Sequence, residues 1–191
     1  PTWPHSRKNL ENLENTMKNF EKNMENFENI ESRCDQMSTT AEYKKLIDSI
    51  SAAKRIFLLG NGGLHFVASH MATDLSRLIP DKAAYSFGSV GFVTSNANDH
   101  GFEQLFTRWL ETMITIEKPE ECLVIGMSCS GNSSNVINAL HWANSNKINT
   151  FMMSGQKSEI LNSGINEISF ECDYFHTVEV MCMMMFYDLI H

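Results

Sequence analysis

The sequence has little basic charge and no long hydrophobic run. Its 191 residues include 15 Lys and Arg against 23 Asp and Glu, which gives a formal net charge of −8. Because no basic stripe is visible, we expect no binding of nucleic acid, and any bound phosphate would be small and held locally. No apolar run approaches the length of a membrane span, and no secretory signal pattern is present. We therefore expect a cytoplasmic protein without a membrane partner.

Proline is also scarce, and the cysteines give no sign of a disulfide framework. The five cysteines are odd in number and fall mostly inside predicted helices or strands, which is typical of reduced thiols rather than a disulfide framework. Four prolines and an apolar fraction of 42% fit one domain with a sizeable core. Residues 1–7 do not begin with methionine and are interpreted as an added or disordered tail outside the fold.

Residues 8–53 are predicted to form two helices that serve oligomerisation. Residues 8–37 contain no Gly or Pro, and their apolar positions recur three and four apart on one face of a helix. This stripe consists of Leu10, Leu13, Met17, Phe20, Met24, Phe27 and Ile30. So narrow a stripe is typical of a long helix that packs against another helix, in a neighbouring subunit or in its own. A second helix is predicted over residues 41–53.

From residue 54 to residue 191, predicted strands alternate with predicted helices. The strands are expected at 55–59, 83–87, 122–127, 148–153 and 167–171. The helices are expected at 64–78, 102–114, 133–146 and 176–191, with shorter ones within 88–98 and near 157–162. This alternation predicts a parallel sheet covered by helices on both faces. Ligands of such sheets bind beyond the carboxyl ends of the strands.

Two strand-to-helix turns are suited to an anion. Residues 60–63 (Gly-Asn-Gly-Gly), here called the glycine turn, follow the first strand, and residues 128–133 (Ser-Cys-Ser-Gly-Asn-Ser), the serine loop, follow the third. Backbone N–H groups at a helix start favour a phosphate, and the loop hydroxyls can add to them. The glycine turn is neither a P-loop nor a dinucleotide fingerprint, so no nucleotide cofactor is expected. Either turn alone could be a plain tight turn or a set of helix caps, but the two together favour a phosphorylated ligand.

These motifs resemble those of the sugar isomerase (SIS) domain family. The glycine turn, residues 98–103 (Asn-Asp-His-Gly-Phe-Glu) and the serine loop have the order and spacing of that family. Within it, the chain from residue 10 onward is most similar to the phosphoheptose isomerases. The resemblance implies a flavodoxin-like three-layer αβα sandwich with a five-stranded parallel sheet, preceded by a long N-terminal helix. It also implies a homotetramer with active sites at subunit interfaces, and often a bound zinc.

The same resemblance implies aldose–ketose isomerisation of sedoheptulose 7-phosphate, or of a related phosphorylated sugar, in the biosynthesis of surface-polysaccharide heptose. The serines of the serine loop match the family's phosphate-binding serines, with Cys129 in place of a usual threonine. Asn61 and Asp99 match residues that line the sugar site, and Glu179 stands where the family has a glutamine. The substrate-binding residues implied in this way are Asn61, Gly62, Gly63, Asp99, Ser128, Cys129, Ser130, Ser133 and Glu179.

The catalytic positions implied by the resemblance carry substitutions. The family has a His and a Glu four residues apart, here His70 and Asp74, and a His on the last helix, here Tyr187. A spacing of four residues places both side chains on one helical face. Isomerisation needs a base and an acid, so Asp74 is the predicted base and Tyr187 the predicted acid–base partner. A tyrosine side chain, with an ordinary pKa of about 10, is a poorer acid or base at neutral pH than histidine, but it can donate a hydrogen bond to a sugar oxygen.

Alternatively, His70, Asp74 and Glu179 form a three-ligand set for zinc with one open coordination position, at which the metal would polarise the carbonyl. Glu179 and Tyr187 are also compatible with an ordinary helix surface.

Two other functions stay open from the sequence. Leu64 stands where the family has a serine and Ser89 where it has an aspartate. With Tyr187, these substitutions suggest a catalytically lapsed SIS protein that binds a sugar phosphate as a regulator or scaffold. A tetrameric adaptor for another protein is the third alternative, which the three loop serines disfavour. His65 and His100 lie near the predicted site without an assigned role.

Overall fold

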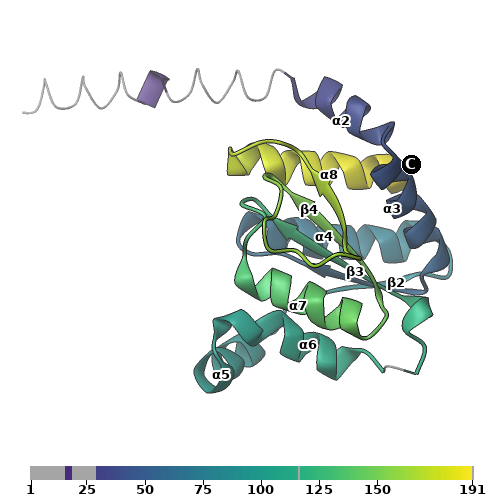
Figure 1. Cartoon of the computed structure of the whole chain (residues 1–191), viewed down its shortest axis with the longest axis vertical. Coiled ribbons are helices and arrows are strands. Elements are labelled where there is room, and N and C mark those ends of the chain that lie inside the picture. The colour runs from purple at the N-terminus through teal and green to yellow at the C-terminus, as the bar shows by residue number, and fades with distance from the viewer. Residues whose placement is uncertain (1–15, 19–28, 116, 191) are drawn as a thin grey trace, which may run out of the picture.

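Five short segments form one parallel sheet with the strand order β2-β1-β3-β4-β5. The computed structural model describes residues 16–18, 29–115 and 117–190, and it is shown in Figure 1. The strands are β1 (Arg55–Leu59), β2 (Ala83–Ser86), β3 (Cys122–Ser128), β4 (Asn149–Ser154) and β5 (Asn166–Ser169). Every neighbouring pair is parallel. The five strands predicted from the sequence are therefore confirmed, to within a few residues at their ends.

Helices cover both faces of this sheet, which confirms the predicted three-layer αβα sandwich (Figure 1). On one face lie α2 (Ile30–Ser38), α3 (Ala41–Ala52), α4 (Gly63–Leu78) and α8 (Phe175–Ile190). On the other lie α5 (Val90–His100), α6 (Leu105–Met113) and α7 (Ser134–Ser145), with the short 3₁₀ turn η1 (Phe102–Gln104). A second short turn, η2 (Pro119–Glu121), leads into β3. Successive side chains of a strand point to opposite faces, so Leu58 packs in the first layer and Phe57 in the second.

The strand order places the two predicted ligand turns side by side. Strands β1 and β3 are central, neighbouring strands, and β1 from Ile56 to Leu59 is fully buried. The crossovers leave these two strands in opposite directions, one toward β2 and the other toward β4. This is the topological switch point at which open α/β sheets bind ligands. The glycine turn and the serine loop both lie there, at the carboxyl ends of the strands.

The N-terminal predictions fall largely outside the described residues. The predicted tail over 1–7 and most of the predicted helix over 8–37 belong to that part of the chain, and α2 covers the last residues of the predicted helix. The helix predicted over 41–53 is confirmed as α3. It begins where the Thr40 side chain accepts a hydrogen bond from the backbone N–H of Tyr43 at 3.2 Å, a typical N-cap.

The short helix predicted near 157–162 is wrong. These residues form an irregular loop between β4 and β5. Glu167 accepts hydrogen bonds from the backbone N–H of Ser158 and from the Ser154 hydroxyl, both at 2.8 Å. A carboxylate on β5 therefore fixes the loop through tertiary contacts, and these override the local helical preference.

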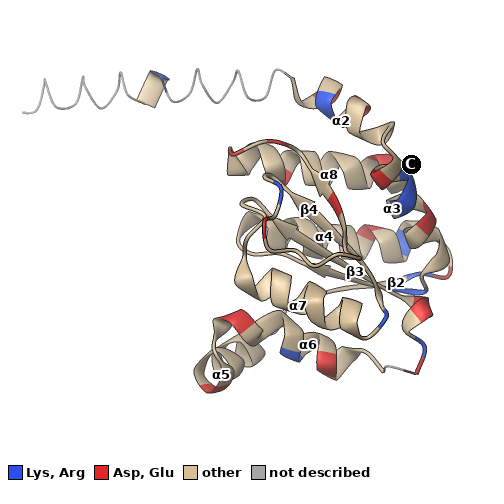
Figure 2. Cartoon of the chain, viewed as in Figure 1, with Lys and Arg blue, Asp and Glu red and all other residues tan. Residues whose placement is uncertain are grey.

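Charged residues are dispersed over the outer helices and loops. In the view of Figure 2, Lys and Arg lie singly and among Asp and Glu, without a continuous stripe. Within the described part of the chain, no helix combines the length and the apolar character needed to cross a bilayer.

Candidate active site at the carboxyl edge of the sheet

The glycine turn favours glycine through a positive φ at Gly62 and through close neighbours at Gly60 and Gly63. Gly62, the N-cap residue of α4, has φ +56°, which disfavours any residue with a Cβ. A Cβ on Gly60 would lie 2.8 Å from the Leu64 backbone, and one on Gly63 would overlap the Glu179 carboxylate. Leu64, at the position where the resemblance leads us to expect a serine, is buried in the core beneath the turn, so its side chain does not line the site.

The serine loop presents hydroxyls and open backbone donors at the start of α7. The hydroxyls of Ser128 and Ser133 lie 2.9 Å apart, and the Ser133 N–H donates to the Ser128 hydroxyl at 3.3 Å. The Ser133 side chain does not cap the helix. Among the described residues, nothing accepts a hydrogen bond from the backbone N–H groups of Ser134 and Asn135. These donors, with the helix dipole behind them, suit an anion.

A reciprocal pair of amides joins the two turns. The Asn61 and Asn135 side chains each donate to the other's oxygen at 2.9 Å, and the Val136 N–H donates to the same Asn135 oxygen at 2.9 Å. Asn135 is only 2% exposed. Sequence reasoning missed its role, although an asparagine on the apolar face of a helix, next to Val136 and Ile137, is a signal that could have found it. The pair fixes the predicted sugar-site residue Asn61 relative to the serine loop.

The loop after β4 supports the serine loop from the other side. The Gly155 N–H donates to the Ser128 carbonyl at 3.2 Å, and the Ser158 hydroxyl donates to the Asn132 side chain at 3.3 Å. Gly131, with φ +71°, passes so close to Gln156 that a Cβ would overlap its carbonyl oxygen. The geometry of the serine loop is thus held by two neighbouring crossovers.

The predicted acid–base residues meet on the outer surface of α4 and α8. His70 Nε2 lies 3.0 Å from the Tyr187 hydroxyl and 3.5 Å from Asp74 Oδ2. We call these three residues the His70 cluster. Both contacts are made by the same imidazole nitrogen, so the cluster brings a phenol and a carboxylate to one side of the histidine ring. His70 and Tyr187 are exposed and Asp74 is partly buried, so the cluster can reach a ligand outside the helices.

The predicted metal set of His70, Asp74 and Glu179 is not assembled. Glu179 contacts Gly63 at the start of α4, whereas Tyr187, eight residues further along α8, contacts His70, seven residues further along α4. At 1.5 Å rise per residue, Glu179 is about 12 Å along the helix from the His70 cluster. Among the described residues, no group of three His, Cys, Asp or Glu could hold a metal ion. The three-ligand prediction is therefore wrong. Helices α4 and α8 run in parallel, so Glu179 stays beside the start of α4 and far along the helix from His70 and Asp74.

Glu179 lies instead between the glycine turn and the serine loop. Burial and then the Glu179 charge raise the pKa of the Cys129 thiol to about 11. Cys129 is therefore a neutral thiol at physiological pH, and its Sγ lies 3.8 Å from the carbonyl oxygen of Phe175. A neutral thiol adds no negative charge to a loop that would bind phosphate.

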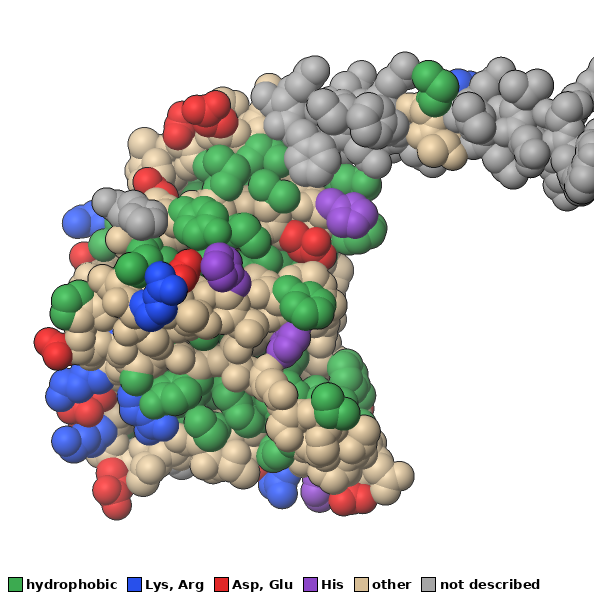
Figure 3. Space-filling model, turned by 180° about the vertical axis from the view of Figure 1, so that it is seen from behind, with side chains coloured by type: hydrophobic (Ala, Val, Ile, Leu, Met, Phe, Trp, Pro, Cys, Tyr) green, Lys and Arg blue, Asp and Glu red, His purple; other side chains and the backbone are tan. Residues whose placement is uncertain are grey.

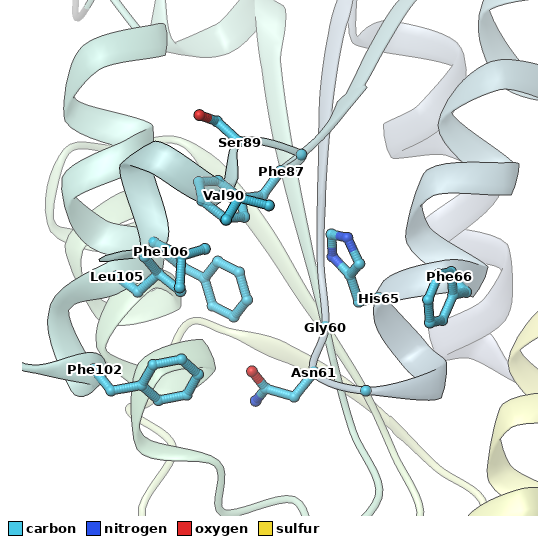
Figure 4. Close-up of a pocket in the computed structure, with 13 residues that line it drawn as sticks. Gly60, Asn61, His65, Phe66, Phe87, Ser89, Val90, Phe102, Leu105 and Phe106 are labelled. Atoms are coloured by element: carbon cyan, nitrogen blue, oxygen red, sulfur yellow. The ribbon is translucent and has the colours of Figure 1, made fainter. Parts of the chain in front are cut away.

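A pocket of about 290 Å³ opens beside the glycine turn (Figure 4). Its lining residues are Gly60, Asn61, Gly62, His65, Phe66, Phe87, Gly88, Ser89, Val90, Val93, Phe102, Leu105 and Phe106. The pocket thus contains Asn61, Gly62 and the unassigned His65. Asp99 does not line it: this carboxylate lies at the exposed end of α5 and accepts a hydrogen bond from the Asn98 amide at 2.8 Å.

Comparison with known proteins gives relatives in sequence and in structure. The phosphoheptose isomerase of Buchnera aphidicola is 33% identical over 111 residues, which are 56% of this chain and 55% of that protein. That of Escherichia fergusonii is 29% identical over 134 residues, 68% of this chain and 67% of that protein. The structure of the phosphoheptose isomerase from Neisseria gonorrhoeae superposes with a TM-score of 0.72 at 18% identity, covering 93% of this chain and 96% of that chain. No protein-family model matches the chain.

These comparisons confirm the predicted similarity to phosphoheptose isomerases and show that the fold is shared with them. The chain spans about half the length of the first curated relatives that it matches.

Proposed function

We propose that the chain is an aldose–ketose isomerase that acts on sedoheptulose 7-phosphate or a related phosphorylated sugar. The observation that carries the proposal is the serine loop, whose hydroxyls and open N–H groups are tied to Asn61 through Asn135. Two separate turns are thereby held as one surface at the switch point of the sheet. The similarity to phosphoheptose isomerases supports the reaction class.

The phosphate would bind to backbone N–H groups and hydroxyls. The Ser130 hydroxyl and the Ser133 hydroxyl border the open start of α7, together with the N–H groups of Ser134 and Asn135. Ser128 is 1% exposed and hydrogen-bonded to Ser133, so we assign it the task of orienting the Ser133 hydroxyl. This arrangement suits a chain with a net charge of −8, because it holds an anion with local dipoles.

The His70 cluster would supply the acid–base chemistry. Asp74 would take the proton from the carbon next to the carbonyl, and Tyr187, hydrogen-bonded to His70, would serve the sugar oxygens. His70 lies seven residues beyond Gly63, about 10 Å along α4. This separation is why the proposal includes a homotetramer whose active sites lie at subunit interfaces, where the cluster of one chain can face the sugar bound by another.

The test is interconversion of sedoheptulose 7-phosphate followed by NMR. We expect turnover by the wild type, loss of turnover in Asp74→Asn, and no change in Asp48→Asn, which alters an exposed acid on α3 in the same way. Binding of the sugar phosphate without turnover would instead support the lapsed binder. No stabilisation of the protein by any sugar phosphate in a thermal-shift series would support the adaptor.

A further inference from the structure

We propose that Asn61 is a deamidation site, at which attack by the Gly62 backbone nitrogen converts the Asn61 amide to a carboxylate at a rate set by the amide pair with Asn135. The modification itself goes beyond the proposed function. Only its effect on phosphate binding rests on that function.

The sequence of the glycine turn supplies the reacting groups. Asn61 and Gly62 are the only asparagine–glycine pair in the chain, and glycine has no side chain to shield its nitrogen. The Gly62 nitrogen attacks Cγ of Asn61, the Cγ–Nδ2 bond breaks, and ammonia leaves with the proton of the Gly62 nitrogen. The product is a five-membered imide. Water then adds to either imide carbonyl and opens the ring, which gives aspartate, or isoaspartate with the backbone running through the side chain.

The surroundings of Gly62 leave this attack open. Gly62 is exposed, a Cβ on it would have no neighbour within 4 Å, and its N–H has no acceptor among the described residues. Water reaches the turn from the pocket that Asn61 and Gly62 both line. Val90 of α5 lines the same pocket, and Glu179 of α8 lies against Gly63, so the turn lies between these helices. Figure 3 shows the molecule from behind, hollowed at its edge between the parts that carry α5 and α8.

The side chain of Asn61, in contrast, is fixed by two hydrogen bonds. Its oxygen accepts from the Asn135 amide and its nitrogen donates to the Asn135 oxygen, both at 2.9 Å. Ring closure makes Cγ tetrahedral and expels Nδ2, so it breaks this flat arrangement. Asn135 is 2% exposed and also accepts from the Val136 N–H, so it cannot follow Asn61 outward. The pair therefore slows a reaction that the rest of the turn permits.

The carboxylate that the reaction leaves behind changes the proposed phosphate site. In aspartate, an oxygen replaces the nitrogen that donates to Asn135, so two oxygens face each other across that contact. Asn135 cannot turn its amide round without losing the bond from the Val136 N–H. The new negative charge lies beside Asn135, whose backbone N–H is one of the open donors at the start of α7. A phosphate on these donors would be repelled, so the modified protein would bind it more weakly.

The first test is incubation of the full chain, followed by peptide mass spectrometry that separates asparagine, aspartate and isoaspartate. The loss of two neutral hydrogen bonds corresponds to a reaction about 30-fold faster, and we expect this increase at Asn61 in Asn135→Ala. Ile50→Ala is the control for lost stability, because it truncates a buried side chain near the end of α3, at the opposite end of β1 from the turn. We expect it to keep the wild-type rate. Wild type unfolded in urea gives the rate without the pair, even if Asn135→Ala does not fold.

The second test is calorimetry with inorganic phosphate on Asn61→Asp, which carries the product side chain. We expect binding at least about 10-fold weaker than in the wild type, because the added charge repels the anion. Equal rates at Asn61 in the wild type and in folded Asn135→Ala would overturn the role of the pair, as would a wild-type rate that urea does not raise. Unchanged phosphate binding by Asn61→Asp would overturn the effect on the site. No phosphate binding by the wild type would overturn the proposed function and leave the deamidation standing.

Discussion

Replacing Asn135 by alanine tests the contact that joins the two turns. The substitution removes both amide hydrogen bonds to Asn61 and the bond from the Val136 N–H. Each neutral hydrogen bond contributes about 1 kcal/mol net, and an unpaired buried donor costs more. Because Asn61 is partly exposed, water can replace one of its lost partners. We therefore expect the free energy of unfolding to fall by about 2–3 kcal/mol.

For a chain of this size, such a loss lowers the melting temperature by roughly 4–12 °C. The assay is thermal and urea unfolding followed by circular dichroism. The matched control is Asn138→Ala on the same helix, because the Asn138 side chain makes a single, partly exposed hydrogen bond to the Glu103 carbonyl at 3.1 Å. The control is expected to lose less than about 1 kcal/mol. The reasoning is refuted if Asn135→Ala is no less stable than Asn138→Ala, or if it binds inorganic phosphate as tightly as the wild type.

Three further predictions concern the residues around these turns. Gly63→Ala should cost less than about 1 kcal/mol of stability, because the overlapping Glu179 carboxylate is the end of a flexible side chain that can move away. Glu179→Ala should remove this cost in a double-mutant cycle, whereas additive effects would argue against the contact. Tyr187→Phe should lower kcat at least about 100-fold with little change in stability, because the side chain is exposed and its hydroxyl is bonded, among the described residues, to His70 alone. An unchanged kcat would remove Tyr187 from the reaction. The rate of Cys129 alkylation, followed by mass spectrometry, should increase with pH up to about pH 11, and Glu179→Gln should shift this increase to lower pH because it removes a negative charge that raises the thiol pKa. An alkylation rate that levels off near pH 8.5 in the wild type would contradict the placement of the thiol.

The fold could be predicted from the sequence because its signals are local. Short apolar runs such as 55–59 are too brief for a helix, and glycine or serine turns follow them directly. The alternation with helices then leaves few parallel arrangements. The helix predicted near 157–162 does not form, because a long-range contact fixes these residues as a loop. The Glu167 carboxylate, on a strand that comes later in the chain, accepts a hydrogen bond from the Ser158 N–H.

The candidate site was predictable where one turn carries the whole feature, as in the serine loop. It was not predictable where two elements meet. The predicted metal site of His70, Asp74 and Glu179 is wrong because sequence spacing alone cannot tell whether Glu179 or Tyr187 lies beside His70. Asn135 was missed for the same reason, since its partner Asn61 lies 74 residues away in the sequence. The lining of the pocket beside the glycine turn likewise combines the loop after β2 with α5, η1 and α6, which no local pattern brings together.

The most direct test of the isomerase proposal is the exchange of a carbon-bound proton. An enediol intermediate is protonated at C1 or C2 by a base whose proton exchanges with water, so the reaction is run in D2O with sedoheptulose 7-phosphate and followed by NMR. The account predicts deuterium at one of these carbons with the wild type and none with Asp74→Asn. Binding of the sugar with neither interconversion nor deuterium incorporation by the wild type would contradict it for this substrate. Equal incorporation by both proteins would remove Asp74 as the base.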